Sequence, residues 1–410
     1  MENWAPSGQI GVGYLSLSSR SKELVQEVLD SNRLSYGPFS RSFERTLAHI
    51  HGCQYGVLSN SGTSALHVAL AALMERHAWA PGDEVIVPAV TFVATANVVL
   101  HLGLRPVFVD VDPHTYNIDC EQIAGAISGR TRCIMPVHLC GLPADMPRVM
   151  QIAAEHELEV VEDSCETMFA SVAGKPVGSH GTIGCFSTYT AHILTTGVGG
   201  LSITDDPELA LVMRSLCNHG RHPSYIAIDD DQYEPGQPLA DVIDKRFLFE
   251  RIGFSYRITE IEAAIGLAAL EEREACLAQR RLNAEALTKG LADLDSVGLL
   301  RTPTVPAGFE HAFMMYPLVV GQPAARSALI DHLEAAGIET RPLSPLVNQP
   351  VYRRLFGDLE AGLPVARILN RQAFYVGCHH GMGERETSYV VRTIRSFFAS
   401  RDDVLSRVAG

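Results

Sequence analysis

The N-terminal half of the chain alternates between short strand-like runs and helical runs, and this alternation constrains the fold most strongly. Strand-like runs occur at Tyr55–Ser59, Asp83–Pro88, Pro106–Asp110, Cys133–Val137, Leu158–Glu162 and Gly184–Tyr189. Apolar residues at helical spacing fill Ala65–Met74, Ala94–His101, Cys120–Ser128 and Asp145–His156. Such alternation predicts an α/β fold with a mostly parallel sheet covered by helices on both faces.

The length and the later segments predict two domains. A chain of 410 residues exceeds the roughly 250–300 residues at which a single core stops growing. We expect an N-terminal arm (1–14), a large domain (15–270) and a smaller C-terminal α/β domain (271–410). A helical region from Glu260 to about Leu291 would be the hinge, and Asn218–Arg251 would form a long loop.

Composition excludes several classes of function. The formal charge is −14, from 47 acidic and 33 basic residues, and no basic block could follow a nucleic-acid backbone. No apolar run reaches the roughly 18–20 residues of a membrane span, and the first residues lack a signal-peptide pattern. The nine cysteines are scattered without a CxxC or CxC pair, so we expect no metal site and a reduced, cytoplasmic protein.

The segment from Gly184 to Gly200 has the most unusual composition. An apolar run leads into His192, two threonines and glycines at 197, 199 and 200. These glycines would let a ligand approach closely, although a tight turn between two strands explains them too. The ordinary pKa of histidine is near neutral, so His192 could transfer protons, or it could make a structural hydrogen bond.

Other polar or aromatic residues fall at the carboxyl ends of the predicted strands, where ligands bind in α/β sheets. Gly62 and Thr63 lie at a strand-to-helix turn and could bind a phosphate, or they could belong to an ordinary helix cap. Asp163 would place a carboxylate at the mouth of the sheet or cap the next loop. Phe92 could stack on a flat ring or lie in the core. Ser187 could donate to a phosphate or be an ordinary strand serine.

These pieces, taken in order, resemble the DegT/DnrJ-type nucleotide-sugar aminotransferase family, which are pyridoxal-phosphate (PLP) enzymes with the type I, aspartate-aminotransferase-like fold. The matching segments are Tyr36-Gly-Pro with Phe43-Glu44, Asn60-Ser-Gly-Thr-Ser-Ala-Leu66, Asp110-Val-Asp-Pro113, Pro136-Val-His-Leu-Cys-Gly141, Pro143-Ala-Asp-Met146, Glu162-Asp163, Val177-Gly-Ser179 and Thr195-Thr-Gly-Val-Gly-Gly200. The resemblance implies that Gly62, Thr63 and Ser187 hold the cofactor phosphate. It also implies that Phe92 stacks on the ring and Asp163 pairs with the ring nitrogen.

Three positions depart from the family pattern. Glu166 replaces the family's Gln near the ring hydroxyl, and Ser255 replaces an Asn that reaches into a neighbouring subunit's site. His192 stands where the aminotransferases carry the lysine that links covalently to the cofactor. The four lysines are Lys22, Lys175, Lys245 and Lys289, all in other segments. An imidazole cannot form that link, so PLP or pyridoxamine 5'-phosphate (PMP) would be held without a covalent bond.

The His-for-Lys exchange resembles the 3-dehydratase branch of the family, typified by GDP-4-keto-6-deoxymannose 3-dehydratase. That resemblance implies that His192 is the acid/base in removal of the 3-hydroxyl from a nucleotide-linked 4-keto-6-deoxy sugar. Glutamate would regenerate the amine cofactor, and a homodimer would carry its sites at the subunit interface. Two alternatives remain: a sugar aminotransferase, natural or with His192 replacing an original lysine, and a non-catalytic paralogue that binds PMP or a sugar nucleotide.

Overall fold

The strand-like runs form one seven-stranded sheet in the order β1-β9-β8-β5-β4-β2-β3. The computed structural model describes residues 4–6, 8–222, 244, 247–343 and 346–399. The strands are β1 (Tyr55–Ser59), β2 (Glu84–Pro88), β3 (Arg105–Val109), β4 (Thr131–Ile134), β5 (Glu159–Asp163), β8 (Ile183–Ser187) and β9 (Gly200–Thr204). Within this sheet only β9 runs against the others, since it pairs antiparallel with β1 and β8. The prediction of a mostly parallel sheet is confirmed.

Helices cover both faces of this sheet because its strands bury side chains on both sides. Val85 and Val87 of β2 face a core with α3 and α7, while Ile86 faces a second core with α5 and α6. The helices of this part are α1 (Ser19–Ser31), α2 (Pro38–Ile50), α3 (Gly62–Arg76), α4 (Val93–His101), α5 (Cys120–Ala126), α6 (Met146–Glu155) and α7 (Pro207–Cys217). A 3-10 turn η1 (Leu139–Gly141) and a hairpin of β6 (Ser171–Val172) and β7 (Lys175–Pro176) complete it.

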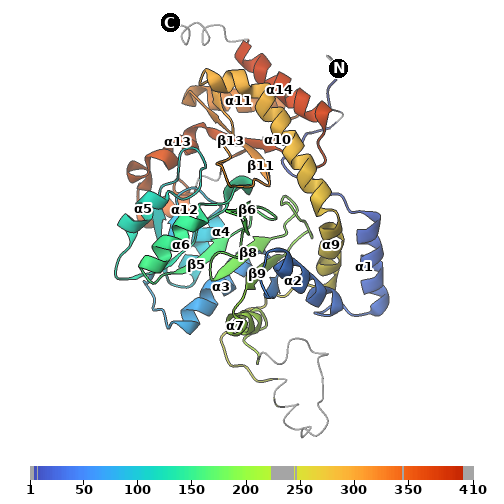
Figure 1. The fold of residues 1–410 in the computed structure, drawn as a ribbon, viewed down its shortest axis with the longest axis vertical. Helices are drawn as coiled ribbons and strands as arrows, with labels where there is room; N and C mark the ends of the chain where they lie inside the picture. The colour runs from blue at the N-terminus through green and yellow to red at the C-terminus, as the bar shows by residue number, and fades with distance from the viewer. Residues whose placement is uncertain (1–3, 7, 223–243, 245–246, 344–345, 400–410) are drawn as a thin grey trace.

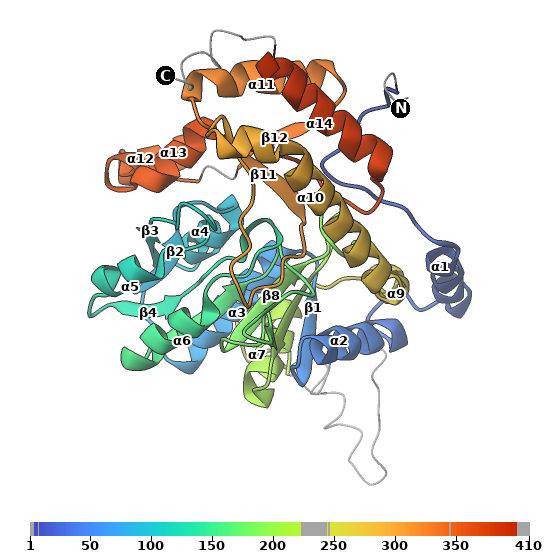
Figure 2. The same cartoon turned by 45° about the horizontal axis from the view of Figure 1, so that its top comes forward.

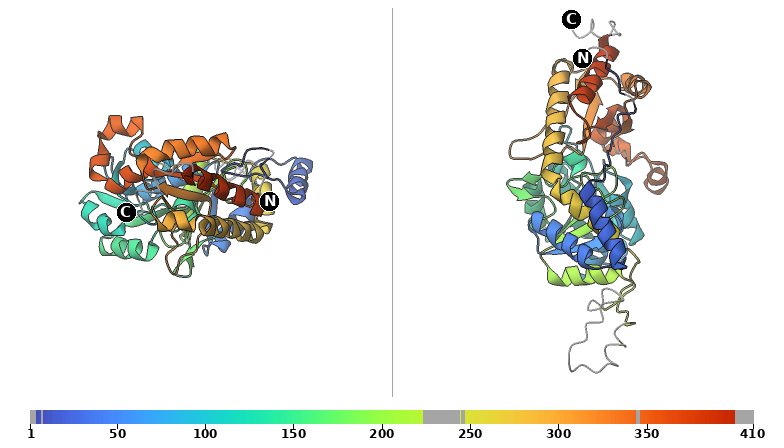
Figure 3. Two further views of the ribbon diagram at one scale, coloured as in Figure 1. Left: turned by 90° about the horizontal axis from the view of Figure 1, so that it is seen from above. Right: turned by 90° about the vertical axis from the view of Figure 1, so that its right-hand side faces the viewer.

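The C-terminal unit, Arg273–Ala399, is built on a second, antiparallel sheet in the order β10-β11-β13-β12. Its strands are β10 (Leu300–Arg301), β11 (Met315–Val320), β12 (Thr340–Pro342) and β13 (Ala373–Gly377). Its helices are α10 (Arg273–Ser296), α11 (Pro323–Ala335), α12 (Pro350–Phe356), η2 (Leu359–Gly362), α13 (Pro364–Gln372) and α14 (Glu384–Ala399). This orange-to-red unit lies above the larger sheet (Figure 2; Figure 3, right).

The connection between the two sheets differs from the prediction. The expected continuous helical region consists of α9 (Glu260–Glu271) and α10, separated by a break at Glu272. The α9 helix lies against α1 and α2, whereas α10 extends along α14 (Figure 1). The helix therefore changes direction where it passes from one sheet to the other.

The remaining expectations concern loops, thiols and membranes. Most of the predicted loop Asn218–Arg251 lies outside the described residues. All nine cysteines fall within the described part of the chain and are free thiols. Among the helices in the described ranges, none combines the length and apolar character needed to cross a membrane.

Candidate active site

The loops after β1, β5 and β8 meet at one point of the sheet edge. A Cβ added to Gly62 would lie 2.6 Å from Ser187 Cβ and 2.7 Å from Cys165 Sγ, so only glycine fits here. Gly62 and Thr63 are the first residues of α3, whose N-cap Ser61 accepts from the backbone N–H of Ser64. The first N–H groups of a helix have no intrahelical acceptor, so those of Gly62 and Thr63 suit an anion beside Ser187.

Asp163 ends β5 with its carboxylate inside the protein. Thr95 Oγ1 donates to Asp163 Oδ2 at 2.8 Å, and the Cys165 N–H donates to Oδ1 at 3.2 Å. Because the Thr95 proton is used in this way, Thr91 must be the donor in its 2.8 Å contact with Thr95. Burial raises the pKa of Asp163. The partners of this carboxylate in the described ranges include a hydroxyl and a backbone N–H but no lysine or arginine, so a cationic ligand would offset the cost of its burial.

Phe92 is the N-cap residue of α4, one turn before Thr95. Its side chain is 62% exposed, which excludes the alternative that it belongs to the core. The backbone N–H of Thr95 donates to the Phe92 carbonyl at 3.3 Å. This backbone bond fixes Phe92 at the start of the helix turn that carries Thr95, the hydrogen-bond partner of Asp163.

Glu166 lies three residues after Asp163 and is buried. Its Oε2 accepts the backbone N–H of Cys140 at 2.9 Å. Burial raises the pKa of Glu166 to about 7, and the nearby Asp163 adds to the effect. A carboxyl with this pKa can donate or accept a hydrogen bond near neutral pH.

His192 follows β8 in a tight turn and is half-buried. Its Nδ1 lies 3.2 Å from the Ser187 carbonyl oxygen, which can only accept, so Nδ1 carries the proton of this bond. Burial lowers the pKa of His192 to about 4, with a further contribution from Arg280. The imidazole is therefore neutral at physiological pH, and its Nε2 holds a lone pair.

The glycines after His192 serve the protein backbone. Gly199 and Gly200 link the turn to β9, and a Cβ on Gly200 would lie 2.2 Å from the Ser61 carbonyl. A Cβ on Gly199 would lie 2.4 Å from Thr188 Oγ1. We expected these glycines to let a ligand approach the backbone. At Gly199 and Gly200, it is instead other parts of the chain that lie close to the backbone. Gly197, with φ of +94°, does require the left-handed region.

The Ser255 side chain forms no hydrogen bond with these residues in the described part of the chain, although the carbonyl of the next residue, Tyr256, accepts the Asn60 N–H at 2.7 Å, two residues before Gly62. The Ser255 side chain is exposed and accepts from Arg257 at 3.0 Å. Lys22, Lys175 and Lys289 are exposed on α1, β7 and α10, away from the turn that carries His192. Lys245 lies outside the described residues.

A buried pair beside this cluster, His138 and Glu162, is not among the residues predicted from the sequence. The Ala144 N–H donates to His138 Nδ1 at 2.9 Å, so the His138 proton is on Nε2, which lies 3.0 Å from Glu162 Oε2. Glu162 also accepts the N–H groups of Gly178 and Gly181. These contacts connect β5 to the segment between β7 and β8 and to the residue before Asp145. Thr95 was missed as well, because nothing in its local sequence reveals a contact with Asp163.

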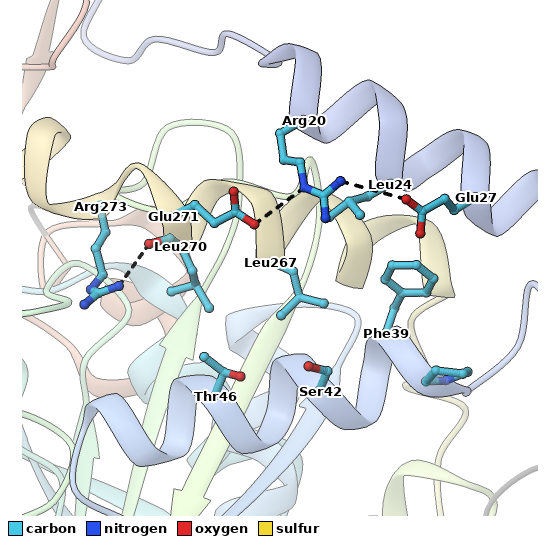
Figure 4. Close-up of a pocket in the computed structure, with 11 residues that line it drawn as sticks. Arg20, Leu24, Glu27, Phe39, Ser42, Thr46, Leu267, Leu270, Glu271 and Arg273 are labelled. Atoms are coloured by element: carbon cyan, nitrogen blue, oxygen red, sulfur yellow. Dashed lines mark hydrogen bonds and ion pairs between the residues drawn. The ribbon is translucent and has the colours of Figure 1, made fainter.

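A cleft of about 490 Å³ lies elsewhere, between α1, α2 and α9 (Figure 4). Leu24, Phe39 and Leu267 line it, and Arg20 reaches Glu27 and Glu271 along its edge. None of the predicted site residues lines this cleft.

Comparison with known proteins identifies the family. Residues 16–395 match the DegT/DnrJ/EryC1/StrS aminotransferase family. The GDP-perosamine synthase of Caulobacter vibrioides is 35% identical over 390 residues, which are 94% of this chain and 97% of that protein. The GDP-4-keto-6-deoxy-D-mannose 3-dehydratase of Yersinia pseudotuberculosis is 30% identical over 365 residues, 87% of this chain and 91% of that protein.

A solved structure agrees with these matches. The E. coli GDP-4-keto-6-deoxy-D-mannose-3-dehydratase with bound hydrated PLP has a TM-score of 0.84 and 26% identity, covering 94% of this chain and 99% of that chain. The chain therefore belongs to the DegT/DnrJ/EryC1/StrS aminotransferase family and has the type I fold of PLP-dependent enzymes.

Proposed function

We propose that this protein is a PLP/PMP-dependent enzyme that removes the 3-hydroxyl of a nucleotide-linked 4-keto-6-deoxy sugar, without a covalent lysine link to its coenzyme. One observation carries the proposal: a neutral imidazole, His192, with its Nε2 lone pair free, follows Ser187 in the cluster that also contains Asp163 and Gly62. The dehydratases named above support the choice of reaction.

The residues of the cluster fit this coenzyme. Gly62 and Thr63 would bind its phosphate with their backbone N–H groups, and Ser187 with its hydroxyl. The exposed Phe92 ring would stack on the pyridine ring, and the buried Asp163 carboxylate would hold the proton of the ring nitrogen. Glu166 would lie near the ring hydroxyl. The bound coenzyme would supply an electron sink for the carbon next to its amine.

His192 performs the proton transfers in this proposal. Its Nε2 lone pair would take a proton from the aminomethyl carbon of the bound coenzyme, and the imidazolium would then give that proton to the departing 3-hydroxyl, which leaves as water. The Ser187 carbonyl fixes the ring orientation throughout, because it binds Nδ1–H in both charge states. Hydrolysis to the keto product would release the coenzyme's nitrogen as ammonia, and glutamate would restore the amine coenzyme, leaving 2-oxoglutarate. A homodimer would place Ser255 at the neighbouring subunit's site.

The test is a product analysis. The purified protein is incubated with PMP, glutamate and GDP-, dTDP- or CDP-linked 4-keto-6-deoxy sugars, and the products are identified by mass spectrometry and NMR. We expect a 3-deoxy keto sugar. An amino sugar as the sole product would refute the dehydratase assignment, and borohydride-stable attachment of the coenzyme to a lysine would refute non-covalent binding.

The family name and the perosamine synthase relative support a second candidate, a sugar aminotransferase. The His192→Lys variant separates the two functions. If dehydration is native, the variant loses 3-deoxy product. A large gain in amino-sugar formation with an otherwise inactive wild type would favour the aminotransferase. Binding of PMP without deuterium exchange at its aminomethyl carbon would favour the non-catalytic alternative.

A further inference from the structure

The last residues of the N-terminal arm, Ile10–Tyr14, are bound to the C-terminal unit rather than to the helices that follow them. The Ile10 N–H donates to the Gly337 carbonyl at 2.8 Å, and the Glu339 N–H donates back to Ile10 at 2.9 Å. The Val12 N–H donates to Glu339 Oε2 at 2.8 Å. Three hydrogen bonds therefore bind the arm as an added strand-like segment at the start of β12.

Tyr14 and Gly11 also lie directly on the end of β13. His379 Nε2 donates to the Gly11 carbonyl at 3.1 Å, and the Tyr14 ring stacks on His379 with centroids 5.4 Å apart and an angle of 13°. A Cβ on Gly377 would lie 2.2 Å from the Gly11 oxygen, and one on Gly381 would lie 2.6 Å from the Tyr14 ring. The glycines at these two positions make this close contact possible.

Arg280 of α10 binds the segment around His379 on which Gly11 and Tyr14 lie. Its Nη1 donates to the carbonyls of Phe313, Met314 and Cys378, the last directly before His379. The side chain is 1% exposed and forms no ion pair with a carboxylate in the described ranges. A buried guanidinium that is bound only to carbonyls fixes the backbone that carries them. Displacing that backbone would leave the buried positive charge without hydrogen-bond acceptors.

The arm then touches the turn that carries His192. A Cβ on Gly13 would lie 3.1 Å from Ala191 Cα and 3.3 Å from Ala191 Cβ. Ala191 is bonded directly to His192. Tyr14, Ile193, Leu194 and Thr195 line a cavity of only about 40 Å³, so little space separates the arm from this turn.

We propose that the N-terminal arm is a positioning element for His192, with Gly13 as the contact that sets the position of the imidazole relative to the C-terminal unit. The inference rests on the proposed role of His192 as the base. The C-terminal unit, the arm and Ala191 form a continuous series of contacts that ends at the histidine.

The test is Gly13→Val, whose added methyl groups must displace Ala191. Gly8→Val is the matched control, because a Cβ there meets nothing within 4 Å. NMR of the imidazole nitrogens in the coenzyme-free protein reports His192 directly. We expect the Gly13 variant to shift the His192 Nε2 and Nδ1 resonances, and to lower kcat for deuterium exchange at the PMP aminomethyl carbon by about 10- to 100-fold, with a smaller change in KM.

The two readouts separate this proposal from the proposed function. Unchanged His192 resonances in a folded Gly13→Val protein would overturn the positioning role, whatever the activity. A wild type without exchange would refute the function, while a resonance shift would still support positioning. If Gly13→Val does not fold, Tyr14→Leu removes the stacking on His379 without a clash. It should shift the same resonances, and the absence of any shift would overturn the proposal.

Discussion

At the scale of single residues, the site depends on which nitrogen of His192 carries the proton. Burial lowers the pKa of His192 to about 4 from an ordinary value of 6.5. The folded protein therefore binds fewer protons at this position than the unfolded chain between these two values, so this histidine lowers stability as pH falls through that window. We expect an NMR titration of the coenzyme-free protein to show a neutral, Nδ1-protonated ring down to about pH 4. A midpoint near 6.5 would contradict the burial argument.

Glu166 changes the stability of the protein with pH in the opposite direction to His192. Burial raises the pKa of Glu166 from 4.5 to about 7, so the folded state holds a proton that the unfolded state has lost between these values. The unfolding free energy should fall as pH rises through this window, by about 1–3 kcal/mol. Glu166→Gln should remove that loss, which makes the variant the more stable protein at pH 8 but not at pH 4.5.

Urea denaturation of the coenzyme-free protein at pH 5, 6, 7 and 8 measures the effect. The control is Glu285→Gln, an exposed glutamate on α10, which should leave the pH dependence unchanged. Parallel stability curves for wild type and Glu166→Gln would show that Glu166 is ionised throughout.

At the scale of elements, Glu260, the first residue of α9, connects that helix to the start of α2. Its carboxylate accepts the N–H groups of Gly37, Phe39 and Ser40 and the Ser40 hydroxyl. Glu260 is 1% exposed, so removing it leaves buried donors without acceptors. We expect Glu260→Ala to destabilise the protein by about 3–5 kcal/mol in urea denaturation.

Glu262, on the same helix, provides the comparison for this prediction. It completes a capping box with Thr259, so Glu262→Ala should cost only about 1 kcal/mol. Equal effects of the two substitutions would show that the Glu260 contacts contribute little.

The same contacts show what a sequence can and cannot predict about this fold. Strands and helices follow from local periodicity, so the order of elements and the parallel sheet were predicted, with ends shifted by a few residues. The start of α3 was placed three residues late, because Gly62 is a poor helix former that is required here by its contact with Ser187. The break at Glu272 could not be predicted, because no glycine or proline stands there.

Contacts between distant segments had no local signal. Glu260 reaches Gly37, Thr95 reaches Asp163, and Gly13 reaches Ala191, in each case across many residues of sequence. The candidate site residues other than Ser255 lie at the carboxyl ends of strands of the larger sheet or in the turns and helix starts that follow them, but their roles remain predictions. The predicted role of Ser255 involves a neighbouring subunit's site, and a single chain contains no such neighbour.

At the scale of the whole molecule, Asp110 joins the larger sheet to the C-terminal unit. It lies fully buried directly after β3, and its carboxylate accepts the N–H groups of Val365 and Ala366, each at 2.8 Å. These are the free first-turn donors of α13, so a residue from one sheet caps a helix that packs on the other. The proposed domain division, 1–14, 15–270 and 271–410, would place this cap across the domain boundary.

Asp110→Ala should therefore weaken the contact between the two sheets more than it destabilises either sheet. Without the carboxylate, two buried N–H groups lose their acceptor, and α13 should open more often. We expect hydrogen–deuterium exchange of the α13 amides to accelerate by about 10- to 100-fold, while the amides of β5 and β8 stay protected. Asp358→Ala, which removes an exposed cap of η2 just before α13, should change exchange only locally. Equal acceleration in β5 and α13 would mean that Asp110 stabilises the fold as one cooperative unit and not the contact between its two sheets.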